Sequence, residues 1–253
     1  MLKVDHLTLR FEGLIATNDV SMEIEDHKVT ALIGPNGAGK TTLFNQIAGV
    51  YKPESGKIYL DGEDITGLKP YQICEKGITR TYQVIKLFSG MSVLDNVMVG
   101  MHSKLKRNFW QDVFHSKKMR VTEKAALEKA HALLNLVGLE KYASYPAGAL
   151  AYGQQRLVEI ARAMASDPKL LLLDEPAAGM NSQEKMELNE KIKAIIEMGT
   201  TVLLVEHDMS MVMNIADKIY VLNSGRNLAD GTPSEIAANP AVIEAYLGRG
   251  EYS

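Results

Sequence analysis

The chain has 253 residues, of which 46% are hydrophobic, and its 28 Lys and Arg against 31 Asp and Glu give a formal net charge of -3. This composition excludes general disorder, allows a sizeable core, and gives no overall electrostatic reason to expect nucleic acid. The single cysteine, Cys74, excludes an internal disulfide and favours a reducing cytoplasm. Because no apolar run could cross a bilayer and no secretion signal begins the chain, we expect a soluble protein, for which any membrane role would depend on other chains.

The first third of the sequence predicts short strands and one helix. Apolar and polar residues alternate over residues 7–11, which indicates a half-buried strand, and the apolar run 29–33 indicates a buried one. Residues 41–48 form a helical pattern that ends at Gly49. A further strand over residues 57–60 leads into an Asp-Gly turn. This order is typical of half of an α/β core.

A complete G-x-x-x-x-G-K-[ST] motif lies between the buried strand and the helix. Its residues are Gly34, Pro35, Asn36, Gly37, Ala38, Gly39, Lys40 and Thr41. Glycines allow the main chain to approach a polyphosphate closely, and successive N–H groups and the helix N-terminus favour an anion. Lys40 would reach the β and γ phosphates, and Thr41 would offer its hydroxyl to Mg²⁺. The structural alternative is a glycine-rich turn with a surface lysine.

The middle of the chain predicts helices. Apolar residues recur at helical spacing over residues 125–137, before Gly138, and strand patterns are weak over about residues 90–155. We therefore expect an inserted helical lobe. Within it, residues 104–120 mix basic and aromatic side chains, so they could form a solvated insertion, contact a partner protein, or bind nucleic acid or acidic lipid head groups.

The last third of the chain predicts the second half of the core and carries two groups of polar residues. Short strands are expected over residues 170–173 and 201–205, with a helix over 182–198 between them. Asp174 and Glu175 follow the first strand, where one carboxylate could support Mg²⁺ and the other could act on an attacking water. Alternatively, they are ordinary polar residues at a strand end. His207 follows the second strand and could sense the γ phosphate.

The order of these motifs resembles the ATP-binding subunits of ABC transporters over nearly the whole chain. The resemblance implies an α/β fold with a RecA-like P-loop ATPase core, an antiparallel β subdomain and an inserted α-helical subdomain. It implies one ABC ATPase domain over 1–253, with the core at 1–88 and 156–230, the helical subdomain at about 89–155, and a C-terminal helical tail at 231–253.

The same resemblance implies roles for individual residues. The phosphate loop extends from Gly34 to Thr42 and binds ATP, with Lys40 among the catalytic residues. Phe11 matches the position that stacks on adenine, although it could simply be a half-buried strand residue. Gln83 matches the Q-loop, near Mg²⁺ and the attacking water, although it could be a solvated loop amide. The metal ligands implied are Thr41, Gln83 and Asp174; Glu175 is the implied base and His207 the implied switch histidine.

Residues 150–156 occupy the place of the family's LSGGQ signature and begin a predicted helix. Gly153 and Gln154 would face the γ phosphate of ATP held by a second ATPase subunit. Two residues depart from the pattern, because Ala151 replaces the serine and Tyr152 replaces the first glycine. Asn181 stands where the family usually has aspartate. Ala151 and Tyr152 suggest that the two sites of the dimer are unequal, and Asn181 suggests that communication across the dimer differs.

Three strings of sequence, at residues 174–181, 206–209 and 239–248, resemble the ATPases of branched-chain amino-acid importers. The resemblance implies a heterodimer with a related ATPase, two transmembrane permeases and, indirectly, an extracytoplasmic binding protein, with this chain on the cytoplasmic face of the membrane. No nucleic acid is expected. Two alternatives remain open: a soluble ABC-type ATPase that acts on nucleic acid or the translation machinery, and the ATPase of a lipid or lipopolysaccharide exporter.

Overall fold

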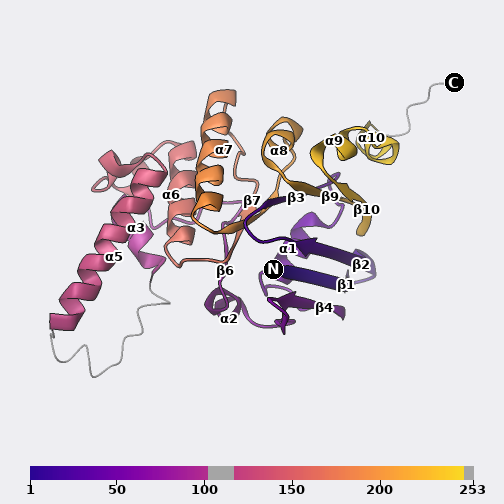
Figure 1. Ribbon diagram of the computed structural model, residues 1–253, viewed down its shortest axis with the longest axis horizontal. Helices are drawn as coiled ribbons and strands as arrows, with labels where there is room; N and C mark the ends of the chain where they lie inside the picture. Colours follow the sequence, from indigo (N-terminus) through magenta and orange to yellow (C-terminus); the bar gives the residue numbers. More distant parts are fainter. Residues whose placement is uncertain (102–116, 248–253) are drawn as a thin grey trace.

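Two β-sheets form the centre of the molecule, with helices at their sides (Figure 1). The protein is described by a computed structural model that covers residues 1–101 and 117–247. Most of the basic and aromatic segment 104–120 therefore lies outside the described residues, and the expectation for it stays a prediction.

The smaller sheet is antiparallel, with strand order β2-β1-β4-β5. Its strands are β1 (Leu2–Phe11), β2 (Leu14–Ile24), β4 (Ser55–Leu60) and β5 (Glu63–Asp64). The strands predicted over residues 7–11 and 57–60 are confirmed as parts of β1 and β4. Both are longer in the structure, and β2 was not predicted, although Val20, Met22 and Ile24 alternate with polar residues and are buried, as in a half-buried strand.

The larger sheet has six strands in the order β10-β9-β3-β8-β7-β6. They are β3 (Val29–Ile33), β6 (Ile78–Arg80), β7 (Leu170–Asp174), β8 (Thr201–Val205), β9 (Lys218–Asn223) and β10 (Arg226–Gly231). All neighbours pair in parallel except β9 and β10, which are antiparallel. Since β3, β7 and β8 are buried along their whole length, their continuous apolar runs made them predictable.

The two faces of the larger sheet pack into different cores. Leu171 and Leu173 of β7 pack in a cluster with helical residues, whereas Leu170 and Leu172 pack in a second cluster with residues of helix α1 and the antiparallel sheet. The alternation of side chains along a strand produces this division. The parallel strands also bring the loops that follow β3, β6, β7 and β8 to one edge of the sheet, where ligands bind in α/β proteins.

The described residues outside the middle of the chain form six helices, of which two match helices that were predicted with their bounds. The six are α1 (Lys40–Ile47), α2 (Pro70–Glu75), α7 (Ser182–Glu197), α8 (Met209–Ile215), α9 (Pro233–Ala237) and α10 (Pro240–Leu247). The predicted helices over residues 41–48 and 182–198 are thus confirmed as α1 and α7, and Gly49 and Gly199 follow them with positive φ angles of 73° and 91°. Each glycine permits the left-handed turn that ends its helix.

The middle of the chain is helical where the structure describes it. It contains α3 (Val93–Val99), α5 (Lys117–Leu136), the short 3-10 turns η1 (Glu140–Tyr142) and η2 (Ala147–Ala149), and the start of α6 (Tyr152–Met164). Among the described residues of 89–155 there is no strand, as expected from the sequence. The division into core, helical subdomain and tail stays a prediction.

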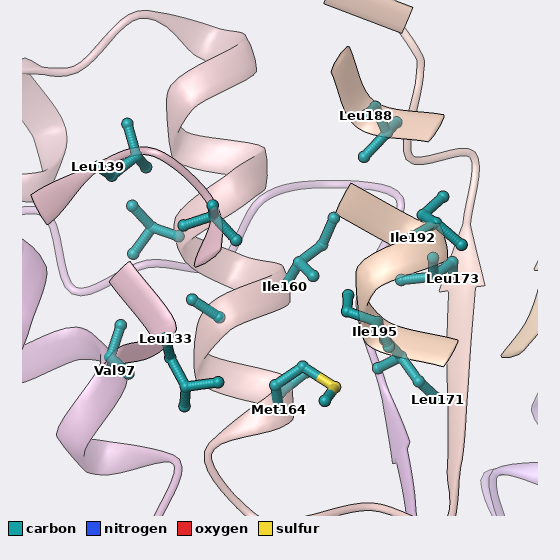
Figure 2. Packing of buried hydrophobic residues seen from close by; sticks show 14 of the residues in the cluster. Val97, Leu133, Leu139, Ile160, Met164, Leu171, Leu173, Leu188, Ile192 and Ile195 are labelled. Carbon is teal, nitrogen blue, oxygen red and sulfur yellow. The ribbon is translucent and has the colours of Figure 1, made fainter. Parts of the chain in front are cut away.

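Helix α6 joins this helical region to the core. Figure 2 shows Ile160 and Met164 of α6 between residues of the helical region, such as Leu133, and residues of β7 and α7, such as Leu171 and Ile195. All of these side chains are buried in one cluster. A displacement of α6 would therefore disturb packing on both of its sides.

Candidate functional site

The phosphate loop joins the end of β3 to the start of α1 and depends on glycine. Gly34 has a φ of 148°, and a Cβ there would lie 2.1 Å from the carbonyl oxygen of Leu222. Gly39 has a φ of 99°, and a Cβ there would lie 2.3 Å from the carbonyl oxygen of Ala16. A side chain at either position would thus meet both backbone strain and a collision. The loop is fixed between its neighbours in the conformation that exposes its main chain.

Lys40 is the first residue of α1 and lies over the loop. Its ammonium group donates hydrogen bonds to the carbonyl oxygens of Gly34, at 2.6 Å, and Pro35, at 2.9 Å. Burial lowers the pKa of Lys40, and the nearby carboxylate of Glu175 opposes this shift. Gly39 gives α1 no side-chain cap, so the N–H groups of its first turn can bind an anion. Thr41 is exposed in that turn.

Asp174, at the end of β7, forms a buried ion pair that the sequence did not predict. Its Oδ2 accepts a hydrogen bond of 2.7 Å from the guanidinium of Arg80, and their side chains are 3% and 11% exposed. Arg80 ends β6 and also donates to the side-chain oxygen of Asn45 on α1. The guanidinium lies over the ring of Phe44, 5.2 Å from its centroid. Arg80 therefore holds together β6, β7 and α1 beneath the phosphate loop.

Gln83 and His207 meet at Glu175. The side-chain nitrogen of Gln83 donates a hydrogen bond of 3.0 Å to Oε2 of Glu175. Nδ1 of His207 lies 3.9 Å from Oε1 of Glu175, and the imidazole is largely exposed. Glu175 itself has a left-handed φ of 46°, and its N–H donates to the carbonyl oxygen of Val205, which fixes the main chain at this residue. The structure thus brings together residues from the loops after β6, β7 and β8.

Two further residues near these loops were missed. Glu206 is 1% exposed and accepts hydrogen bonds from the N–H groups of Ala177, at 2.9 Å, and His207, at 3.1 Å. It therefore ties the loop after β7 to the loop after β8. Burial raises the pKa of the Tyr246 phenol, and a hydrogen bond with the main chain of Gly34 opposes the shift, so α10 reaches the phosphate loop. The sequence holds a signal for Glu206, because this glutamate directly follows the apolar run of β8. It holds no signal for the contact of Tyr246 with the phosphate loop.

The start of α6 contacts the loop that follows Glu175. A Cβ on Gly179 would lie 3.5 Å from the ring of Tyr152, and one on Gly153 would lie 3.4 Å from Oε1 of Glu184. Gln154 accepts a hydrogen bond of 3.2 Å from the N–H of Ala151, which precedes the helix. The predicted contact of Gly153 and Gln154 with a second subunit's nucleotide stays a prediction.

Asn181 has a clear structural role as the N-cap of α7. Its side-chain oxygen accepts a hydrogen bond of 3.0 Å from the N–H of Glu184, and its own N–H donates to the Glu184 carboxylate at 2.8 Å. Asparagine and aspartate cap helices about equally well. The capping role therefore accounts for Asn181 in place of aspartate.

Phe11 lies at the end of β1 with an exposed ring. Its exposed fraction is 41%, and it packs edge-on against Tyr51 with 5.2 Å between ring centroids. Phe11 pairs with Leu14 of β2, two residues before Ala16, whose carbonyl oxygen lies beside Gly39 of the phosphate loop. The ring is open to a stacking partner, and its contact with adenine stays a prediction.

The residues expected to hold Mg²⁺ offer oxygen atoms, which suit this ion. They are the Thr41 hydroxyl, the Gln83 amide and the Asp174 carboxylate. In the described part of the chain no three His, Cys, Asp or Glu side chains form a metal-binding group. Mg²⁺ in nucleotide sites typically has only one or two protein carboxylates and completes its shell with phosphate oxygens and water. The donor set therefore fits Mg²⁺ bound together with a nucleotide.

Comparison with known proteins identifies the family. A profile described as ABC transporter matches residues 17–178, which is more than half of the sequence. The chain belongs to the ABC transporter family. A second profile, described as Branched-chain amino acid ATP-binding cassette transporter, matches residues 226–252 of this ABC protein.

Relatives of similar length agree with this assignment. The ABC protein is 49% identical to the high-affinity branched-chain amino acid transport ATP-binding protein BraF of Pseudomonas aeruginosa and 46% identical to LivG of Escherichia coli K12, which has the same description. Each comparison spans 249 residues and 98% of both chains. Among solved structures, the ADP conformation of an ATP-binding cassette of an ABC transporter matches with a TM-score of 0.85 and 31% identity, over 98% of both chains.

These comparisons confirm the predicted family and fold class. The α/β architecture, with one antiparallel and one mixed sheet, is that of the P-loop ATPase core of ABC cassettes. No helix in the described part of the ABC protein is long and apolar enough to span a membrane. The roles of individual site residues stay predictions.

Proposed function

We propose that this chain binds and hydrolyses ATP to energise a transporter that imports branched-chain amino acids. The observation that carries the proposal is the 46–49% identity, along nearly the whole chain, to proteins described as branched-chain amino acid transport ATP-binding proteins. The match of residues 226–252 to a branched-chain amino acid transporter profile supports the same substrate class.

The phosphate loop binds the β and γ phosphates in this proposal. The ammonium of Lys40 leaves the carbonyl oxygens of Gly34 and Pro35 and pairs with phosphate oxygens, which are stronger acceptors because they are charged. The exposed ring of Phe11 stacks on adenine. Mg²⁺ supplies positive charge next to the phosphates, and Thr41, Gln83 and Asp174 are the residues that would hold it.

Glu175 acts as the base. Its carboxylate accepts a proton from a water molecule, the water oxygen bonds to the γ phosphorus, and the bond from that phosphorus to the bridging oxygen of ADP breaks. The side-chain nitrogen of Gln83 donates to one carboxylate oxygen of Glu175 at 3.0 Å, which leaves the other oxygen to accept the proton from the water. The exposed imidazole of His207 donates a hydrogen bond to the γ phosphate and stabilises its charge.

The site is completed by other chains. The start of α6, with Gly153 and Gln154, faces ATP on a second, related ATPase, so two ATP molecules lie between two subunits. Closure of this pair moves two transmembrane permeases, which receive substrate from an extracytoplasmic binding protein. A cassette of the family with 25% identity to this chain has been solved as a dimer bound to ADP and Pi. In this assembly the chain lies at the cytoplasmic face of the membrane.

Transport by the assembled complex tests the proposal. The chain is coexpressed with its partner ATPase and permeases, and ATP-dependent uptake of leucine, isoleucine and valine is measured in vesicles. Glu175→Gln, in a complex whose partner site is inactive, should keep ATP binding and lower turnover by about 100-fold or more, since it removes the base. Glu187→Gln changes an exposed carboxylate on α7 and should leave turnover unchanged.

Three outcomes would contradict the proposal. Near-normal turnover by Glu175→Gln would overturn the catalytic assignment. An intact complex that hydrolyses ATP without uptake of these amino acids would overturn the substrate class. Hydrolysis that is stimulated by nucleic acid, with no association with permeases, would favour a soluble ATPase.

A further inference from the structure

Arg156 is the largest fully buried side chain in the described part of the chain. It lies in the second turn of α6 and is 0% exposed. Because burying a guanidinium is costly unless its donors are bonded, the partners of Arg156 indicate what it does.

The guanidinium binds the main chain of the segment that contains Gln83. One terminal nitrogen of Arg156 donates to the carbonyl oxygen of Tyr82, and the other donates to the carbonyl oxygen of Gln83 at 2.7 Å. The first nitrogen also pairs with Glu159 at 2.9 Å, which neutralises the charge. A planar fork can bind two neighbouring carbonyls at once, and a lysine ammonium cannot reproduce that geometry.

These contacts leave the Gln83 side chain free for another partner. Gln83 is exposed, and its amide nitrogen reaches Oε2 of Glu175 at 3.0 Å. The opposite side of the same segment is held by Glu159, whose Oε1 accepts from the N–H of Tyr82 at 3.4 Å. An exposed loop is thereby held by its main chain from inside the protein, with its glutamine directed outward.

Tyr152, where the family pattern has glycine, extends this connection to the start of α6. Its hydroxyl accepts a hydrogen bond of 3.4 Å from Arg156, whose guanidinium lies 5.9 Å from the centre of the ring. The other side of the ring faces Gly179, where a Cβ would lie 3.5 Å away. Gly179 is four residues after Glu175. The contacts therefore form a closed path from Glu175 through Gln83, Arg156 and Tyr152 back to the loop after Glu175.

We propose that Arg156 is a positioning residue that fixes the main chain at Tyr82 and Gln83 so that the Gln83 amide meets Glu175. Through Tyr152 it also sets the start of α6 relative to the same loop. The inference rests on the proposed ATP hydrolysis, in which Gln83 and Glu175 act together.

Hydrogen exchange on the full-length isolated chain tests the structural part. Arg156→Lys keeps the charge and loses the fork, so the amides of Thr81 and Tyr82, which donate to Leu172 and Glu159, should exchange about tenfold faster or more, while those of the phosphate loop should not change. Equal exchange in the variant and the wild type would overturn the proposal.

Turnover in the assembled complex tests the positioning role. Because a misplaced catalytic group can cost about 100-fold in rate, Arg156→Lys should lower turnover at least about tenfold, with ATP affinity within about twofold of wild type. On a Gln83→Ala background, Arg156→Lys should cause no further loss, since both changes remove the same contact. Losses that multiply, or a loss of ATP affinity equal to the loss of turnover, would overturn the proposal.

A matched control and a milder variant complete the test. Arg226→Lys makes the same replacement at an exposed arginine of β10, outside these contacts, and should leave turnover within about twofold. If Arg156→Lys does not fold, Tyr152→Phe removes only the hydroxyl, and we expect a loss of about threefold that disappears on the Gln83→Ala background. Unchanged turnover in Tyr152→Phe would then overturn the proposal.

Failure of this inference differs from failure of the proposed function. A wild-type complex that does not hydrolyse ATP would overturn the function, and the exchange measurement would still decide whether Arg156 holds the segment. A wild-type complex that hydrolyses ATP, with a folded Arg156→Lys variant equally active, would overturn the inference alone.

Discussion

Removal of Arg80 should strongly destabilise the chain in the absence of nucleotide. In Arg80→Met the carboxylate of Asp174, which is 2% exposed, loses the guanidinium that lies 2.7 Å away. Breaking a buried ion pair by removing one partner costs about 3–5 kcal/mol. The Arg80 side chain is 11% exposed, so solvent partly screens the ion pair. We therefore expect the free energy of unfolding to fall by about 3 kcal/mol, the lower end of this range.

Thermal unfolding of the isolated chain, followed by circular dichroism, measures this loss. For a chain of this size each kcal/mol shifts Tm by about 2–4 °C, so Arg80→Met should lower Tm by about 6–12 °C. Arg10→Met is the control, because Arg10 is 58% exposed and lies 4.0 Å from Glu54. Such a pair contributes about 0–1 kcal/mol, and the control should shift Tm by less than about 4 °C.

A double-mutant cycle separates the ion pair from the other contacts of Arg80. Asp174→Asn needs no counter-charge, so Arg80→Met should cost about 2 kcal/mol less on that background than in the wild type. Saturating ATP with Mg²⁺ should stabilise Arg80→Met more than the wild type, because the ion restores positive charge beside Asp174. Losses that add within about 0.5 kcal/mol, or a Tm change of Arg80→Met no larger than that of the control, would refute this reasoning.

Three further changes test other parts of the molecule. Lys40→Met should weaken ATP binding about 100-fold by calorimetry, since buried charged contacts are worth about 2–5 kcal/mol, whereas the exposed Lys52→Met should not. The Lys185 ammonium holds the pKa of Asp208 below its ordinary 3.8. The contribution of this ion pair to folding stability is therefore present above pH 3.8 and is lost as the pH falls through the folded-state pKa of Asp208. Asp208→Asn should therefore flatten the fall of Tm below about pH 4, and an unchanged slope would contradict it. In Gly100→Ala a Cβ would lie 2.0 Å from the carbonyl oxygen of Arg162, so urea unfolding should show a loss of about 1–3 kcal/mol with unchanged ATP affinity.

Much of the fold was predictable because its central strands are buried on both faces. Strands β3, β7 and β8 are continuous apolar runs, and their predicted bounds agree with the structure within one residue. The antiparallel sheet was only partly predicted, since β2 has several exposed positions and its register with β1 shifts three times. Strand β6 has three residues, and its place beside β7 depends on pairing with residues about 90 positions away. Local periodicity carries no information on such pairing.

The residues of the candidate site likewise include some that local sequence motifs revealed and one, Arg80, whose role they did not. Lys40, Asp174, Glu175 and His207 were recognisable because each lies in a short motif next to a predicted strand. Arg80 lies in a string quoted for Gln83, but its ion pair with Asp174 spans 94 residues and appears only when β6 and β7 are adjacent. A motif therefore indicates which groups meet the ligand, whereas their counter-charges come from the tertiary fold.

The helices differ in whether a side chain caps their first turn. Side chains cap α3, α7, α8 and α9, through Ser92, Asn181, Asp208 and Thr232. Helices α1, α2 and α6 begin after Gly39, Lys69 and Ala151, which give no side-chain cap. A missing cap costs about 1 kcal/mol and leaves N–H groups of the first turn free for an anion. Two of these three helices, α1 and α6, are proposed to face ATP, one in its own site and one in the partner's. Ala151 in place of serine removes a side-chain cap from α6 and keeps its N-terminus open.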